Sequence, residues 1–184
     1  MIRFLLYSFK KEKKLFLILS LCFIAFVAIG IIVGSKATDK IEKIISDVLS
    51  KKFEGILKNV SNNLELSLAI LKNNMLVYLI TITAGTLTFG FVSLIVLISN
   101  GLIVGLVIPI NLKKATLLKT LLLILPHGII EISGFITGAV ASMFLLKRFL
   151  KSKEKSDFKT DFKSFLALCV LGAILIIIAA FIEG

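Results

Sequence analysis

Apolar residues along this chain gather into long runs that contain no charged residue. Three runs are free of charge: Leu15–Ser35, Asn73–Leu112 and Ser164–Ile182. About 18 or more apolar residues are enough for a helix to cross the hydrocarbon core of a bilayer. The hydrophobic share of 58% and the mean hydropathy of +1.04 are also too high for an ordinary soluble domain. The pattern predicts an all-α, polytopic integral membrane helical bundle.

The middle run is about twice as long as one span requires, so it must turn back. We place the turn in GTLTFG, Gly85–Gly90. A turn in SNG, Ser99–Gly101, is the alternative, and it would leave 102–110 as a half helix. About five spans are expected in a single membrane domain, 1–184, at about 15–34, 74–90, 91–109, 127–146 and 164–182. The stretch before Pro126 can form a broken or half helix.

The segment 36–72 is polar overall, but its apolar residues recur at three- and four-residue spacing. They are Ile41, Ile44, Ile45, Val48, Leu49, Phe53, Ile56, Leu57 and Val60. This spacing predicts an amphipathic helix outside the membrane, with Thr38 and Asp39 suited to its start. Such a helix lies on the membrane surface or on its own bundle, or it offers a docking surface for an extracytoplasmic partner or a second copy.

The formal charge of +11 points to lipid rather than to nucleic acid. The basic residues lie next to apolar spans and form no Arg-rich or aromatic-interleaved patch, so anionic headgroups are the expected partners. Twelve of them fall in two short segments, 3–14 and 147–163. The positive-inside tendency therefore places the N-terminus in the cytoplasm of a cell-membrane protein, and five spans place the C-terminus outside.

The candidate chemistry is sparse. Cys22 and Cys169 both lie inside apolar runs and are expected to be packing residues. His127 is the single histidine, and Glu131 is the single acid within a span. A metal or hydrolytic site with enough ligands is not expected from so few groups. We therefore predict no catalytic residue, no metal and no cofactor.

Two glycine pairs, in GLIVG (Gly101, Gly105) and GFITG (Gly134, Gly138), predict close helix packing. On a helix that begins after Pro126, one face carries His127, Glu131, Gly134, Gly138 and Ser142. This face is expected to be buried against protein.

His127 and Glu131, with Asn100, form the candidate polar intramembrane site. Side chains four residues apart on a helix can touch, and a charge at membrane depth costs about 2.5–3.5 kcal/mol on insertion scales. Two interpretations stay open. The pair can satisfy each other and the backbone near Pro126, or it can relay protons or ions.

Several short motifs carry a family resemblance. They are Asn74, Gly85, Gly90, the NG...G of Asn100, Gly101 and Gly105, the LPHG..E of Leu125, Pro126, His127, Gly128 and Glu131, and the small residues around Gly138. With these motifs the chain resembles the stage II sporulation protein M family of multi-pass membrane proteins. The family's namesake in spore-forming bacteria works in engulfment, as the membrane component of a complex with two peptidoglycan-degrading partners. The resemblance therefore implies a membrane organiser without catalytic activity of its own.

We therefore expect a non-enzymatic membrane scaffold or organiser that recruits or localises partner proteins, as a homodimer. If the family role holds, cell-wall hydrolases are among the partners. The alternative is a small transporter or channel that uses the His127–Glu131 pair.

Overall fold

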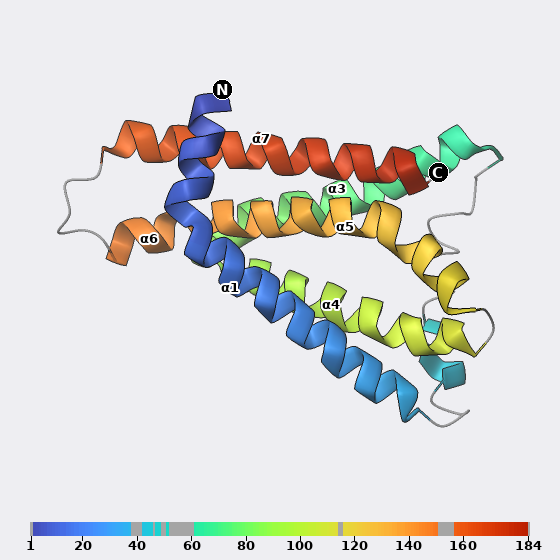
Figure 1. Cartoon of the computed structure of the whole chain (residues 1–184). Helices are drawn as coiled ribbons and strands as arrows, with labels where there is room; N and C mark the ends of the chain where they lie inside the picture. Colours follow the sequence, from blue (N-terminus) through green and yellow to red (C-terminus); the bar gives the residue numbers. More distant parts are fainter. Residues whose placement is uncertain are drawn as a thin grey trace.

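The computed structural model describes residues 2–37, 42–45, 47–48, 51, 61–113, 116–150 and 157–183. Among these residues every regular element is a helix. The helices are α1 (Ile2–Ser35), α3 (Asn63–Leu87), α4 (Phe91–Leu112), α5 (Leu117–Ser142), α6 (Phe144–Leu150) and α7 (Phe158–Glu183) (Figure 1). Five helical stretches are long and apolar enough to cross a membrane: Phe4–Ser35, Asn63–Leu87, Phe91–Leu112, Leu117–Arg148 and Phe158–Glu183. The predicted all-α bundle is confirmed.

The long helices form two groups. α1 packs along α4, while α5 packs along α7, with α3 beside both α5 and α7. In Figure 1 the two groups lie close together near the N-terminus and diverge toward the end that holds the C-terminus. One end of the bundle holds the start of α1, helix α6 and the start of α7, and we call it the first end. The C-terminus lies at the opposite end.

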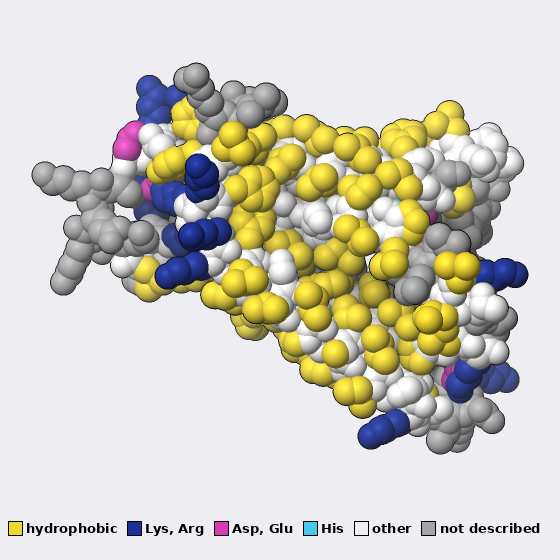
Figure 2. All heavy atoms as spheres, viewed as in Figure 1, with side chains coloured by type: hydrophobic (Ala, Val, Ile, Leu, Met, Phe, Trp, Pro, Cys, Tyr) yellow, Lys and Arg dark blue, Asp and Glu magenta, His cyan; other side chains and the backbone are white. Residues whose placement is uncertain are grey.

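An apolar belt covers the middle of the face shown in Figure 2, and Lys and Arg side chains gather at both ends of that face. The belt includes side chains such as Leu17, Ile18 and Ile24, each of which is 60% exposed. Such exposure is unfavourable in water but costs nothing against lipid tails, which are as apolar as the side chains. The surface is therefore that of a membrane protein with charges at the two headgroup regions.

α1 and α4 approach each other along a seam of glycines. A β-carbon on Gly30 would lie 2.6 Å from the carbonyl oxygen of Leu102, and one on Gly105 would lie 2.2 Å from that of Val27. Two further pairs continue the seam: Gly34 with Pro109, and Gly101 with Phe23. The predicted pair Gly101 and Gly105 therefore packs against a second pair, Gly30 and Gly34 in GIIVG, which the sequence analysis overlooked.

The second group is built around Tyr78 of α3. Its side chain fills a slot where a β-carbon on Gly138 of α5 would lie 2.5 Å from the ring and one on Gly172 of α7 would lie 2.1 Å from the hydroxyl oxygen. The Tyr78 hydroxyl donates a hydrogen bond to the carbonyl oxygen of Cys169, at 2.7 Å. One aromatic side chain thus joins three helices, and its polar end is satisfied inside an apolar core.

Serine hydroxyls join α3, α4 and α5 near the first end. The hydroxyl oxygens of Ser93 and Ser142 lie 2.6 Å apart, and the Ser93 hydroxyl donates to the carbonyl oxygen of Thr81 at 2.8 Å. Both serines lie against Gly85, where a β-carbon would lie 1.9 Å from the Ser93 oxygen. Gly85 is therefore a packing residue at a contact of three helices.

The chain turns back where the preferred interpretation placed the turn. α3 ends at Leu87 and α4 begins at Phe91. Gly90 precedes α4 with a φ of 93°, a left-handed conformation that favours glycine, and Met143 lies against it. Ser99–Gly101, the alternative turn, lies inside α4.

The second span starts earlier than predicted. α3 begins at Asn63, and the side chain of Asn62 caps it by accepting a hydrogen bond from the amide of Glu65, at 2.9 Å. Asn74, predicted at the start of the second span, therefore lies well inside the helix, and residues 63–72, predicted as part of the amphipathic segment, belong to α3. That segment was extended too far because its last residues are polar although they lie at a helix end.

The rest of the predicted amphipathic segment is only partly covered. Residues 42–45, 47–48 and 51 are helical, and Lys113 beside the end of α4 forms an ion pair with Glu42. Ile44 and Val48 are exposed. The predicted start at Thr38 and Asp39, and residues 52–60, lie outside the described residues, so the amphipathic helix as a whole stays a prediction.

The prediction that Pro126 opens the fourth span is wrong. α5 is one helix that begins at Leu117, where the hydroxyl of Thr116 accepts a hydrogen bond from the amide of Lys119 at 3.4 Å. Pro126 lies inside it and has no amide hydrogen for the carbonyl four residues earlier. The ribbon of α5 bends between its yellow first part and its orange second part (Figure 1), as expected of a helix with an internal proline. The half helix before Pro126 is thus the first part of a bent helix.

The stretch that covers the predicted fourth span is made of two helices rather than one. α5 stops at Ser142, Met143 is a turn residue, and the separate helix α6 follows. α7 then begins at Phe158, with Asp157 at its cap: the Asp157 carboxylate accepts hydrogen bonds from the Thr160 hydroxyl and the Lys159 amide. The hydrogen bond from Thr160 contributes most to lowering the pKa of the Asp157 carboxyl, because it stabilises the charged form.

Candidate functional site: a cavity between α1, α4 and α5

A cavity of about 320 Å³ lies between α1, α4 and α5. Its lining includes Phe23, Ile24 and Val27 from α1; Asn100, Val104 and Ile108 from α4; and Leu125, His127, Gly128, Ile129, Glu131, Ile132 and Phe135 from α5. The cavity is thus formed where the two groups of helices diverge. Its volume lies at the lower end of the range for small-molecule sites, roughly 300–1,000 Å³.

All three residues of the predicted polar site line this one cavity. Asn100 comes from α4, and its amide donates a hydrogen bond to the carbonyl oxygen of Val96, at 2.8 Å. His127 and Glu131 come from α5, one turn apart, and both are half-buried. The stripe on α5 then continues from this polar pair into the buried Gly134, as the helical spacing predicts.

His127 also contacts a residue that the sequence analysis did not single out. Its Nε2 atom lies 3.8 Å from the Oε1 atom of Glu183, in the last turn of α7. Glu183 directly follows the last apolar run, where an acid looks like an ordinary flanking residue. Its sequence position shows no link to His127, because only the packing of α5 on α7 brings the two together.

The cavity reaches the apolar surface of the molecule. Ile24 and Ile129 belong to its lining, yet they are 60% and 59% exposed. Ile24 belongs to α1 and Ile129 to α5, and these two helices diverge at this cavity. Apolar, exposed side chains therefore border the route from the surface to Asn100, His127 and Glu131.

This arrangement places an acid, an imidazole and a carboxamide among apolar walls. Such a set can accept and donate hydrogen bonds, hold a cation or pass a proton between its members. Among the described residues no group of three His, Cys, Asp or Glu side chains is placed to hold a metal ion. The remaining predicted packing residues lie elsewhere: Gly85 and Gly90 near the first end, Gly101 and Gly105 against α1, Gly138 against Tyr78, and Asn74 within α3, beside Asn73.

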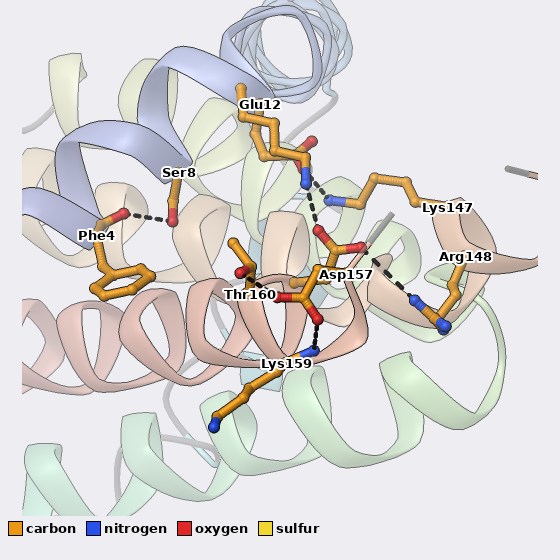
Figure 3. A network of polar contacts seen from close by, with 10 residues as sticks. Phe4, Ser8, Glu12, Lys147, Arg148, Asp157, Lys159 and Thr160 are labelled. Atoms are coloured by element: carbon orange, nitrogen blue, oxygen red, sulfur yellow. Dashed lines mark hydrogen bonds and ion pairs between the residues drawn. The ribbon is translucent and has the colours of Figure 1, made fainter. Parts of the chain in front are cut away.

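A second polar site lies at the first end of the bundle, and sequence reasoning missed it (Figure 3). Glu12 of α1 pairs with Lys147 of α6 at 2.9 Å, and Asp161 of α7 pairs with Lys11 and, at 3.8 Å, with Arg148. We call these five residues the charged cluster. Its members come from distant parts of the chain that each look like a solvated basic flank, so no local pattern marks them as partners.

Comparison with known proteins identifies the family of this chain. The family model of stage II sporulation protein M matches residues 19–184. An uncharacterized protein of Methanocaldococcus jannaschii is 39% identical over 140 residues, which cover 73% of this chain and 79% of that protein. A second uncharacterized protein of the same organism is 31% identical over 186 residues, or 95% of this chain and 81% of that protein. No solved structure matches the chain. With most of its length matched, the chain belongs to the stage II sporulation protein M family.

Proposed function

We propose that this member of the family is a non-enzymatic membrane scaffold that holds a partner protein at the first end of its bundle. The observation that carries the proposal is the charged cluster, which ties the start of α1 to α6 and α7. A surface that holds a partner must keep its shape without the partner, because otherwise ordering it reduces affinity.

Aromatic contacts also stabilise the first end of the bundle. Phe144 of α6 packs against Phe158, Phe162 and Phe165 of α7, with ring centroids 5.4–6.3 Å apart. Arg148 lies over the Phe158 ring, 4.8 Å from its centroid. Ion pairs and ring contacts together hold α1, α6 and α7 in one arrangement at this end of the bundle.

The charge of this end suggests the class of partner. The segments 3–14 and 147–163 carry twelve basic residues, and several of them, such as Lys10 and Lys13, are exposed. An acidic protein surface is the complementary partner. By the positive-inside tendency this end faces the cytoplasm and the C-terminus lies outside.

Two further parts of the expectation belong to this proposal. Cell-wall hydrolases, which the family resemblance implies as partners, would meet the opposite, extracytoplasmic end. A homodimer would need a surface other than the glycine seams, because Gly30, Gly34, Gly101 and Gly105 are already used between α1 and α4.

Transport is the second candidate function, and the cavity that holds Asn100, His127 and Glu131 favours it. The two candidates differ in proteoliposomes. A transporter shows proton- or ion-coupled flux that Glu131→Gln abolishes while the protein stays folded. A scaffold shows the same background flux with and without the substitution.

Photo-crosslinking in native membranes tests the scaffold. A photoreactive residue at Lys10, which is exposed at the first end, is expected to form a protein adduct of defined mass. The same residue at Ile18, 60% exposed in the apolar belt, is expected to react with lipid alone. The absence of a protein adduct at position 10 would count against the proposal.

A further inference from the structure

We propose that the charged cluster also frames a binding site for a phosphodiester anion, with a membrane lipid headgroup as the source that its position favours. The site is a cavity of about 190 Å³ between α1, α5, α6 and α7. Such a site needs no docked protein, and it is separate from the cavity between α1, α4 and α5.

The lining of this cavity is amphiphilic. One part is charged and comes from the cluster: Lys11, Glu12, Lys147, Arg148 and Asp161. The other part is apolar and includes Ala141, Phe144, Phe165 and Leu168. A lipid headgroup with the first carbons of its chains has the same two-sided character, whereas a free inorganic ion would gain nothing from the apolar part.

The formal charge of the lining favours a monoanion. The described lining residues hold three cations and two carboxylates, so one positive charge is in excess. Glu12 and Asp161 hold the cations in place through the ion pairs already given. A phosphodiester carries a single negative charge, which would bring the site to neutrality, and basic pockets between membrane helices are known to take lipid headgroups.

A buried hydroxyl supplies the second observation. Ser164 lines the cavity and is only 7% exposed, and its hydroxyl has no hydrogen-bond partner among the described residues. Leaving a buried polar group unpaired costs about 1–3 kcal/mol. A phosphodiester oxygen in the cavity would accept the hydrogen bond that Ser164 can donate, so the ligand completes the site.

The cavity also lies at the depth where headgroups lie. Its lining comes from the first turns of α1 and α7, from α6 and from the end of α5, and Phe158 and Phe162 are exposed on the neighbouring α7 surface. Aromatic side chains favour the interface between hydrocarbon and headgroups. A lipid bound here would keep its chains in the belt while its phosphate faces Arg148 and Ser164.

Native mass spectrometry of the purified full chain in detergent tests the site. Phosphatidylglycerol, a net anion, is expected to bind more tightly than phosphatidylcholine, whose choline cancels the phosphodiester charge. Arg148→Gln should weaken phosphatidylglycerol binding about fivefold, as for one basic residue near a headgroup. Ser164→Ala should weaken it roughly two- to tenfold, as for one hydrogen bond.

Two controls decide how the result is interpreted. Lys10→Gln removes a cation from the same end but not from the lining, and it should leave binding unchanged. Glycerophosphoglycerol, the soluble headgroup, separates the two sources: competition only at great excess assigns the site to a lipid, and equal competition assigns it to a soluble phosphodiester. Equal binding of both lipids would overturn the proposal. So would losses as large for Lys10→Gln as for Arg148→Gln, or an unchanged affinity in Ser164→Ala.

Discussion

Gly30 of α1 and Gly105 of α4 face each other without side chains between them: a β-carbon on Gly105 would lie 2.8 Å from the Cα atom of Gly30. Lipid provides no hydrophobic force to press helices together, so such close backbone approach is what holds the pair. The seam makes α1 and α4 one unit, and Tyr78 makes α3, α5 and α7 another. Both polar sites lie between parts of these two units.

Enlarging the seam should therefore separate the first unit. Gly30→Ala is expected to lower the free energy of unfolding by about 1–3 kcal/mol, because the added carbon meets backbone that cannot move aside alone. Ala28→Leu adds more volume on the exposed side of the same helix and should leave stability unchanged. Thermal unfolding in detergent compares the two, and equal losses would show that the seam has no special role.

The tyrosine slot gives a second test. Tyr78→Phe removes the hydrogen bond to the Cys169 carbonyl and should cost about 1 kcal/mol of stability. Gly172→Ala should cost more, because its β-carbon would lie 2.1 Å from the Tyr78 hydroxyl oxygen. In the Tyr78→Phe background the same Gly172→Ala substitution is expected to cost less, since that oxygen is gone. If the stability losses of the two substitutions simply add, the close contact between Gly172 and the Tyr78 hydroxyl is not what makes Gly172→Ala costly.

The pair formed by Glu12 and Lys147 should be energetically coupled. Both side chains are mostly buried, at 15% and 29% exposure, so the contact is weakly screened. A double-mutant cycle with Glu12→Gln and Lys147→Met should give a coupling energy of about 0.5–3 kcal/mol. The matched cycle of Glu12→Gln with Lys13→Gln, where Lys13 is exposed, should give close to zero. Equal coupling in the two cycles would exclude a specific pair.

The proposed topology predicts which residues are accessible from each side of the membrane. After replacement of the native cysteines Cys22 and Cys169, single cysteines at Lys10 and Lys159 should react with an impermeant thiol reagent from the cytoplasmic side. A cysteine at Ser61, before α3, should react from the opposite side. Labelling of positions 10 and 61 from one side would contradict an odd number of crossings between them.

Much of the fold follows from the distribution of charge, but the helix starts do not. The five spans and the turn near Gly90 are visible because lipid requires long uncharged runs. The starts of α3 and α5 were missed because their caps, Asn62 and Thr116, lie in polar stretches that composition assigns to the outside. Lys119 near such a start is tolerated because a long side chain can reach the headgroups.

The candidate site was also predictable only in part. Helical spacing alone places His127 and Glu131 on one face of α5, and in the structure Asn100, which was predicted to join them, lines the same cavity. The contacts of His127 with Glu183 and of Glu12 with Lys147 join residues from distant helices. No periodicity within one sequence links such pairs, so only the packed structure reveals them.

The most direct test of the scaffold is the yield of the protein adduct at position 10 when the charged cluster is loosened. Asp161→Asn removes the anion shared by Lys11 and Arg148, whereas Lys159→Gln changes an exposed lysine outside the cluster. We expect Asp161→Asn to reduce the adduct strongly at unchanged protein level and Lys159→Gln to leave it intact. An adduct that survives Asp161→Asn, or falls equally with Lys159→Gln, would contradict a partner held by this fixed arrangement.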